Sequence, residues 1–536
     1  MNFESKETLS PPIEDLVAYL GRAASDAEEA HPAQHQEPYF LSRISDRAGA
    51  LYEKVRGAVD NKEEHFLRRH AIRRVVKRVG WLSGDPKIIA QTLIAELYRG
   101  GHLPRRRVSA LVVEEVERSI AGFIALSRAV ERTVTVPEFL RLRIYLLDIV
   151  SGAVEDRLYS TYNEEAVVTT LARILSESIH GDVPQCSEDA KAKLFYLSAW
   201  RSMFGADRSL SVYKLWTLEY PHWEHVDRES ATQLAEVFAR FVTRTETLLD
   251  DPFIDRLVHR THNHAVAMTV IYGLVKRYRF GLETVMKDPA QFDRYVRETI
   301  ALMYRRDIDR ARRRTWRALL YIFLTKALVI FLAESLYLSA LRAGGIEPLS
   351  LGINLLFHPL LLFFITRGIF PPAKENTERL VRLIGALVYG KEFPTIVVRT
   401  KSWGILGDIA LAFYVVILSG LFVGIIALLE KLNFHSIDIA SFLLFLVLVV
   451  YFGFRIRYTA RRMELMGGHE GFFRSLAELA ALPLVSSGRW LVTKFERLNI
   501  VAIFLDFFIE LPFKLVLDFF DVFSRMLREK KEEIYS

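Results

Sequence analysis

The stretch that decides the fold is Ile405–Leu429, which reads ILGDIALAFYVVILSGLFVGIIALL, together with Ile437–Phe454, which reads IDIASFLLFLVLVVYFGF. Each stretch carries a single charged residue, Asp408 in the first and Asp438 in the second. At about 1.5 Å of helical rise per residue, about 20 apolar residues cross the hydrocarbon core of a bilayer. We therefore expect a membrane-spanning helical hairpin in the C-terminal half of the chain.

Two earlier segments have a similar character. Ala318–Leu341 (ALLYIFLTKALVIFLAESLYLSAL) is long enough to span, whereas Leu351–Thr366 (LGINLLFHPLLLFFIT) is short and contains Pro359. A segment of that length is either a tight span or a re-entrant helix that enters and leaves on one side. The sequence thus predicts a four-span transmembrane helical bundle made of two hairpins.

The charges of the connecting segments alternate along the chain. Lys and Arg number seven in 305–317, one in 342–350, seven in 367–403, one in 430–436 and four in 455–462. Because cytoplasmic loops carry the excess of Lys and Arg, this alternation predicts that both termini are cytoplasmic. The start of the chain lacks the apolar core of a signal peptide, so we expect the N-terminal half to stay on the side of synthesis.

Composition agrees with this division. The 536 residues have a mean hydropathy of +0.15 and a net charge of +7, of which residues 1–300 contribute −2 and residues 301–536 contribute +9. The basic excess therefore lies beside the predicted spans, where it fits anionic lipid headgroups and makes a nucleic-acid partner unlikely. The single Cys excludes an intramolecular disulfide and a thiolate zinc cluster, and it suits a reducing compartment.

The N-terminal half shows helical patterns throughout. Asp-Pro pairs that begin at Asp85, Asp251 and Asp288 combine an N-cap acceptor with a proline suited to the first helical position. The β-like runs Thr133–Val136 and Thr395–Val398 are too few for a sheet-based domain. We predict an all-α protein with a cytoplasmic multi-helix domain, followed by the four-span bundle.

The C-terminal segment 498–528 is apolar except for charged residues spaced three or four positions apart. This spacing predicts an amphipathic C-terminal helix that lies in the membrane interface or covers the bundle. The expected parts of the chain are a polar N-terminal segment 1–38, a cytoplasmic helical domain 39–304, a first transmembrane hairpin 305–366, a cytoplasmic loop 367–403, a second transmembrane hairpin 404–462, and cytoplasmic or interfacial amphipathic helices 463–536.

Polar residues inside the first hairpin are the leading candidates for a functional site. Lys326 and Glu334 lie in the first span, and Asn354 and His358 lie in the second. Lys326 and His358 are both about eight residues, or ~12 Å, from the cytoplasmic end of their span. A functional role for this cluster of four residues would be a polar pathway or a proton-titrating pair. Alternatively, Lys326 and Glu334 snorkel to opposite interfaces, and Asn354 and His358 hydrogen-bond between helices.

Two further motifs are weaker indications of a functional site. Gly420 and Gly424 form a GxxxG motif in the third span, which favours close helix packing within the chain or between copies. Asp255, His259 and His262 have a spacing that places them on one face of a helix, and their side chains suit zinc or iron. No second ligand group accompanies them, so we favour a solvated or locally hydrogen-bonded face over a metal site.

The stretch FLRRHAIRRVVKRVG at residues 66–80 concentrates basic side chains on one helix. Such a helix suits RNA, anionic lipid or an acidic protein, and a plain solvated helix face is the commoner case. No Walker A, GxGxxG, GxSxG, CxxC or HExxH motif is present, so we assign no catalytic residue and no cofactor.

The hairpin sequences TKALVIFLAESLYL and GINLLFHPLLLFFI, and the tail LPFKLVLDFFDVFSRMLREKKEEIYS, resemble those of uncharacterised bacterial integral membrane proteins. The resemblance covers residues 318–380 and 500–536. It implies a bacterial plasma (inner) membrane setting and transfers no activity to this chain.

These features predict a membrane-anchored helical scaffold or interaction protein with no evident catalytic site. Its expected partners are the lipid bilayer, anionic lipid headgroups, and either another protein or further copies of the chain. The alternative is a transporter or oligomeric channel component that uses the polar residues of the first hairpin. A metal-dependent membrane enzyme would rest on the Asp255, His259 and His262 set alone.

Overall fold

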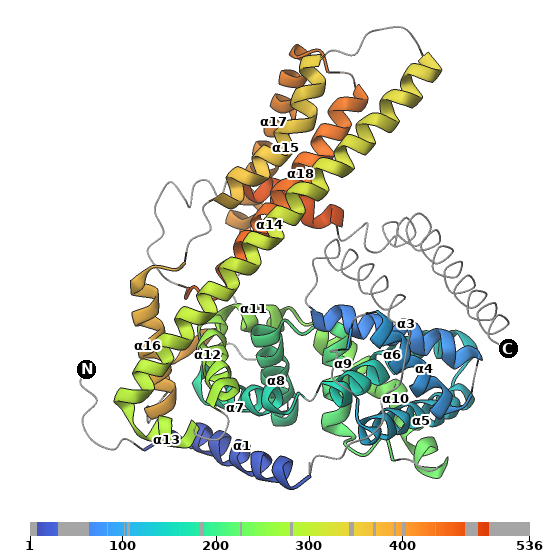
Figure 1. The fold of residues 1–536 in the computed structure, drawn as a ribbon, viewed down its shortest axis with the longest axis vertical. Helices are drawn as coiled ribbons and strands as arrows, with labels where there is room; N and C mark the ends of the chain where they lie inside the picture. The colour runs from blue at the N-terminus through green and yellow to red at the C-terminus, as the bar shows by residue number, and fades with distance from the viewer. Residues whose placement is uncertain are drawn as a thin grey trace, which may run out of the picture. The chain divides into compact units, whose positions relative to one another are not determined.

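The structure is a computed structural model, and it is predominantly helical (Figure 1). The residues that it describes are 8–30, 64–82, 84–100, 102–103, 108–159, 161–181, 187–225, 228–278, 282–341, 348–367, 371–390, 393–398, 404–434, 436–466 and 481–492.

The chain divides into two compact units. The first, here called the helical unit, comprises Met1–Met303, Ala373–Thr400 and Glu464–Met466. The second, here called the bundle unit, comprises Tyr304–Pro372, Lys401–Met463 and Gly467–Ser536. The chain therefore leaves the helical unit after Met303 and returns to it twice.

The helical unit contains most of the described helices and a pair of short strands (Figure 1). In chain order its elements are α1 (Pro11–Ala30), α3 (Glu64–Leu82), α4 (Pro86–Arg99), α5 (Ala110–Thr133), α6 (Val136–Leu158), α7 (Tyr162–Ser178), β1 (Ile179–Gly181), α8 (Glu188–Phe204), α9 (Arg208–Glu219), α10 (Arg228–Leu249), α11 (Pro252–Arg260), α12 (His262–Tyr278), α13 (Leu282–Lys287), the first part of α14 (Pro289–Leu341), α16 (Lys374–Tyr389) and β2 (Ile396–Val398).

Three helices begin where the Asp-Pro pairs predict. Asp85 accepts a hydrogen bond from the backbone N–H of Lys87 at 2.9 Å, and Pro86 is the first residue of α4. Asp251 and Asp288 cap α11 and α14 in the same way. The carboxylate satisfies an N–H group that the first turn leaves without a partner, and proline has no N–H to satisfy.

The N-terminal segment differs from the prediction of a polar stretch over residues 1–38. Residues 11–30 form α1, which packs against α7. Ile13, Leu16, Val17 and Leu20 are buried at spacings of three, one and three residues. That pattern creates an apolar stripe within a mainly acidic and polar sequence, and the stripe makes the helix part of the unit.

The segment expected as a cytoplasmic loop, 367–403, contributes α16 and β2 to the helical unit. Strand β2 pairs in parallel with β1, and Ile179 lies opposite Ile396. Gly181 closes the pair with a φ of +112°, and a Cβ at this position would lie 2.4 Å from the carbonyl oxygen of Val398. Only glycine fits this backbone.

The two β-like runs have different outcomes. Thr395–Val398 contains β2, so a strand there is confirmed. Thr133–Val136 is not a strand, because α5 ends at Thr133 and α6 begins at Val136. Its β-branched residues form an extended junction between two helices, which has the same local backbone preference as a strand.

The second return segment, 464–466, is held by side chains of α12 and α16. The N–H of Leu465 donates to the side-chain oxygen of Asn376 at 2.8 Å. The N–H of Met466 donates to Asn263 at 2.8 Å, and Arg379 donates to the Met466 carbonyl oxygen at 2.9 Å. These polar contacts fix the chain directly after the last helix of the second predicted hairpin.

The described elements of the bundle unit are the rest of α14, α15 (Pro348–Arg367), α17 (Gly404–Lys431), α18 (Ser436–Ala460) and a helical stretch at residues 481–492. Pro359 lies inside α15 without ending it. The core around Phe442 and Val450 of α18 also packs against Leu484. Gly488 allows this close approach, since a Cβ there would lie 2.5 Å from the Tyr451 Cβ.

Within the described residues, two helices are long and apolar enough to cross a membrane, Ala412–Lys431 and Asp438–Ala460. The four predicted spans are therefore not all recovered. Gly352–Arg367 is apolar but shorter than a span, and Ala318–Leu341 lies in α14, where side chains from residue 327 onward are outside the described residues. The predicted amphipathic helix at 498–528 also lies outside the described residues.

Candidate functional site

Two ionisable side chains of the first hairpin lie in direct contact inside the bundle unit. Lys326 of α14 and His358 of α15 are both fully buried, and the Lys326 Nζ lies 2.5 Å from the His358 Nδ1. The His358 Nε2 lies 3.0 Å from the carbonyl oxygen of Phe442 on α18. The two contacts form a hydrogen-bonded chain that joins three helices.

The carbonyl group at the end of this chain fixes the direction of both hydrogen bonds. A carbonyl oxygen only accepts, so the His358 Nε2 carries a proton and the Nδ1 presents a lone pair to Lys326. The Lys326 Nζ also lies 5.4 Å and 5.1 Å from the ring centroids of Phe442 and Phe445, in the range of cation–π interactions. Among the described residues, no carboxylate pairs with Lys326.

The other polar residues of the hairpin are less fully placed. Asn354 is 4% exposed, and its side-chain oxygen has no hydrogen-bond partner among the described residues. Glu334 belongs to the part of α14 whose side chains lie outside the described residues. The expectation that Lys326 snorkels toward an interface is wrong, because its side chain is enclosed by α15 and α18.

The predicted metal ligands do not share a helical face. Asp255 and His259 lie on α11, and His262 begins α12 after a one-residue break. Asp255 pairs with Arg201 at 3.5 Å, and the His262 Nε2 contacts the carbonyl oxygen of Glu464 at 3.1 Å. Within the described part of the chain, no group of three or more His, Cys, Asp or Glu side chains could hold a metal ion.

The GxxxG motif of α17 does not pack within the described chain. A Cβ at Gly420 or Gly424 would find no described atom within 4 Å. Among the described residues, no other helix therefore packs closely on these two glycines, and packing against the rest of the same chain stays a prediction. Association of two copies through this face stays a prediction.

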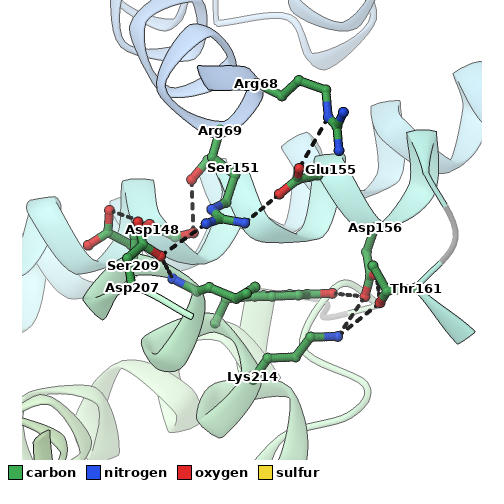
Figure 2. Close-up of polar contacts among 12 residues, drawn as sticks. Arg68, Arg69, Asp148, Ser151, Glu155, Asp156, Thr161, Asp207, Ser209 and Lys214 are labelled. Carbon is green, nitrogen blue, oxygen red and sulfur yellow. Dashed lines mark hydrogen bonds and ion pairs between the residues drawn. The ribbon is translucent and has the colours of Figure 1, made fainter. Parts of the chain in front are cut away.

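A layer of buried ion pairs lies between α3, α6 and α9 in the helical unit (Figure 2). Arg69 is 4% exposed and donates to Glu155 at 2.7 Å and to Asp207 at 3.0 Å. Arg73 donates to Asp148 at 2.6 Å. Removing one member of such a pair leaves a buried charge and typically costs about 3–5 kcal/mol.

Lys214 of α9 is the centre of a second part of this layer (Figure 2). Its Nζ donates to Glu165 at 2.9 Å, to Thr161 at 3.1 Å and to Asp156 at 3.4 Å, and the Tyr213 hydroxyl donates to Asp156 at 2.8 Å. Burial lowers the pKa of Lys214, but Asp156 and Glu165 outweigh it, so the pKa lies above its ordinary value. This lysine therefore stays charged and holds α9 to residues of α6 and α7, and it does not act as a base.

A hollow of about 300 Å³ opens beside the ion pairs. Burial raises the pKa of the Asp148 carboxyl in its wall, and Arg73 opposes that shift. The volume is at the small end of the range for ligand pockets. Its lining residues are Arg69, His70 and Arg73 of α3, Ile144, Tyr145, Asp148 and Ser151 of α6, and Asp207, Arg208 and Ser209 at the start of α9.

The basic run at residues 66–80 is only partly the solvated face that we favoured from sequence. Arg69 is buried in the ion-pair layer, and Arg68 stacks on the ring of Tyr159 at 4.0 Å. Arg73 is half-buried against Asp148, and the exposed basic residues of α3 are His70, Arg74, Lys77 and Arg78. A signal was present in α6, where Asp148 and Glu155 interrupt an otherwise apolar stretch and so require buried partners.

A comparison of this chain with protein-family models, curated proteins and solved structures finds no match.

Proposed function

We propose that the chain is a membrane-anchored helical interaction protein, whose helical unit engages a protein partner. The observation that carries this proposal is the composition of the helical unit from three separated parts of the chain. Residues 373–400 and 464–466, which follow the two predicted hairpins, are built into the same unit as residues 1–303. The anchor and the helical unit are thus joined at several points rather than by one linker.

The same composition supports a proposed topology of four spans with both termini cytoplasmic, in a bacterial plasma membrane. Because the chain returns to the helical unit after 304–372 and after 401–463, each of these segments must cross the membrane an even number of times. The alternation of Lys and Arg among the loops favours the cytoplasm as the side of return.

Cysteine labelling in intact cells tests this topology. In a Cys186→Ser background, Arg342→Cys is expected to react with a membrane-impermeant maleimide, and Arg312→Cys is expected to react only after the cells are opened. Arg342 lies between the first two predicted spans, and Arg312 precedes the first. Equal labelling of both positions in intact cells would overturn the proposed crossings.

The interaction proposal is tested by native purification of the full chain, with identification of the proteins and lipids that co-purify. A protein present in a fixed ratio to the chain supports the scaffold. A lone homo-oligomer without another protein contradicts it.

The contact between Lys326 and His358 favours a second candidate, a transporter or channel component. A buried lysine with an imidazole acceptor, in a segment expected to lie in the membrane, is the kind of group that proton and substrate pathways use. If it forms part of a path, His358→Ala and Glu334→Gln should abolish flux in liposomes and leave the protein folded. Unchanged flux with both variants would exclude this role.

A further inference from the structure

The first half of α6 exposes a stripe of apolar side chains. Val136, Leu140 and Ile144 are 74%, 57% and 49% exposed and follow one another every four residues. The opposite side of the same turns is buried through Leu142 and Tyr145. The stripe is about 12 Å long at the rise of an α-helix, which corresponds to two turns of a helix laid along it. Contiguous exposed apolar surface of this kind marks interaction sites.

A basic stripe runs along the exposed side of α3. His70, Arg73, Arg74 and Lys77 follow the i, i+3, i+4, i+7 spacing, and all of them except the half-buried Arg73 are exposed. This spacing places the four side chains on one face of the helix. Arg69 and Arg73, at one edge of this face, hold α3 against α6 through Glu155 and Asp148, and Arg74 and Lys77 remain at the surface.

The two stripes lie side by side. Arg69 contacts Glu155, and Arg73 contacts Asp148, so the two helices run in opposite directions along the chain. The C-terminal half of α3, with Lys77, therefore lies beside the N-terminal half of α6, where the apolar stripe lies. The hollow described above joins them, because its wall contains His70 and Arg73 from α3 and Ile144 from α6.

We infer that this surface, here called the α3–α6 surface, docks an acidic amphipathic helix of a partner protein, an inference that rests on the proposed interaction function. The apolar face of the partner helix lies on Val136, Leu140 and Ile144. Its acidic side chains face Arg74 and Lys77, and one carboxylate enters the hollow.

Charge decides the class of side chain that enters the hollow. The carboxylates of its wall already have partners, since Asp148 binds Arg73 and Asp207 binds Arg69. Arg208 pairs with Asp250, but that pair is 45% and 65% exposed and is worth little in water. The cation that a visiting group meets most readily is therefore Arg208, and it selects an anion.

The shape favours a protein helix over a membrane. A bilayer surface has no protruding group to fill a hollow, whereas a helix projects a side chain every turn. Single-stranded RNA would call for exposed aromatic rings on which bases stack, and the stripe of α6 is aliphatic. An amphipathic helix supplies both the apolar contact and the anion.

The test uses the full chain in nanodiscs of neutral phosphatidylcholine and two fluorescent synthetic peptides of about 18 residues, the length of five helical turns. Both carry Leu on one face; the first has Glu and the second has Lys at the polar positions. Fluorescence anisotropy measures the Kd of each. The tested variant is Lys77→Glu/Leu140→Asp, in which both residues are exposed and their loss leaves the core intact.

The matched control is Lys87→Glu/Leu111→Asp. Lys87 is exposed on α4. Leu111 is 53% exposed and lies in the first turn of α5, at the end of α5 opposite to the one from which the chain continues into α6. The control makes the same change of charge and hydrophobicity away from the α3–α6 surface.

We expect the Glu peptide to bind the wild type and the control alike, more weakly as salt increases, with the Kd raised about tenfold or more in the tested variant. The Lys peptide should bind weakly to all three. The inference is overturned if neither peptide binds, if the Lys peptide binds as well as the Glu peptide, or if the tested variant binds like the wild type. It is also overturned if the tested variant binds anionic vesicles more weakly than the wild type does but binds the Glu peptide equally well.

Native purification separates this inference from the proposed function. A partner that co-purifies with the wild type and is lost with Lys77→Glu/Leu140→Asp supports both. A partner that the variant retains overturns the α3–α6 surface and leaves the interaction function standing. If no partner co-purifies and the Glu peptide still binds as described, the proposed function fails and the surface stands.

Discussion

The contact between α6 and α9 makes Gly152→Ala a sharp test of the helical unit. Gly152 is buried in α6 and faces Tyr213 of α9. A Cβ at this position would lie 2.4 Å from the Tyr213 Cγ and 2.6 Å from its Cβ and Cδ1. Carbon atoms in contact normally lie 3.5–4.0 Å apart, so the ring would have to move by roughly 1 Å.

The ring has little freedom to move. Tyr213 is 5% exposed, and its hydroxyl donates to Asp156 at 2.8 Å. Overpacking costs about 1–3 kcal/mol, and a lost hydrogen bond to a charged group costs about 1.5–3 kcal/mol. Against this, Ala stabilises a helix interior by about 1 kcal/mol relative to Gly. We therefore expect Gly152→Ala to lower the free energy of unfolding by about 2–5 kcal/mol.

Urea unfolding of the full chain in detergent measures this change through tryptophan fluorescence. Trp216 is fully buried on α9 close to Tyr213, so it reports on the same part of the helical unit. The control is Gly21→Ala, because a Cβ at Gly21 of α1 would find nothing within 4 Å. That change should raise the free energy of unfolding by about 0.5–1 kcal/mol through helix propensity alone.

An unfolding midpoint of Gly152→Ala equal to or above that of the wild type would refute the close approach of α6 and α9. A second variant checks the cause of the loss. In Gly152→Ala/Tyr213→Leu the clash is relieved, so the combined loss should be smaller than the sum of the two single losses. Additive losses would mean that Tyr213 is not what the new methyl group meets.

Three further predictions concern other parts of the chain. Burial lowers the pKa of His264 to about 4, whereas an unfolded histidine titrates near about 6.5. As the pH is lowered, the unfolded state therefore binds the proton first, so the free energy of unfolding should decrease once the pH is below about 6.5, by roughly 2 kcal/mol at pH 5. The decrease should be smaller in His264→Leu. Urea titrations at pH 7 and pH 5 would measure both changes. His358→Leu leaves Lys326 without its acceptor and should lower the thermal stability of the solubilised protein, while Lys326→Leu/His358→Leu recovers part of the loss. Asn376→Ala removes the acceptor of the Leu465 N–H, and we expect hydrogen exchange at that amide to accelerate about tenfold.

Each of these predictions has an outcome that contradicts it. The His264 prediction fails if the wild type and His264→Leu lose the same stability between pH 7 and pH 5. A double variant less stable than His358→Leu would show that the lysine and the imidazole are not partners. Unchanged exchange at Leu465 in Asn376→Ala would place the main restraint on this segment elsewhere.

The local features of the fold could be predicted from the sequence because their causes lie within one turn of chain. Asp85 and Asp251 show this, since cap and first helical residue are neighbours. The joint presence of Lys326 and His358 at equal depth could also be predicted by counting residues along two apolar segments. Their contact with Phe442 could not, because it depends on how a third helix packs.

Long-range partners explain what the sequence analysis missed. The β-like run Thr395–Val398 could be predicted, but its partner β1, more than 200 residues earlier, could not. A three-residue strand such as β1 has no periodicity that its sequence could reveal. Arg69 likewise lies in a basic run typical of a surface helix, and its burial depends on Glu155 of α6. The sequence of the basic run alone could not predict this ion pair.

The division of the helical unit among distant parts of the chain has a consequence for its biosynthesis. A ribosome that has completed Met303 has made most of the unit, but the last piece, Glu464–Met466, lies about 160 residues further on. At the usual rates of synthesis that delay is roughly 8–30 s. Until residue 398 has been made, roughly the first 5–20 s of that delay, α12 lacks α16 as a partner and β1 has an open edge. The helical unit therefore cannot finish folding until residues 304–463 have been made. Under the topology proposed above, insertion of the two predicted hairpins into the membrane is then a step on the folding pathway of the helical unit.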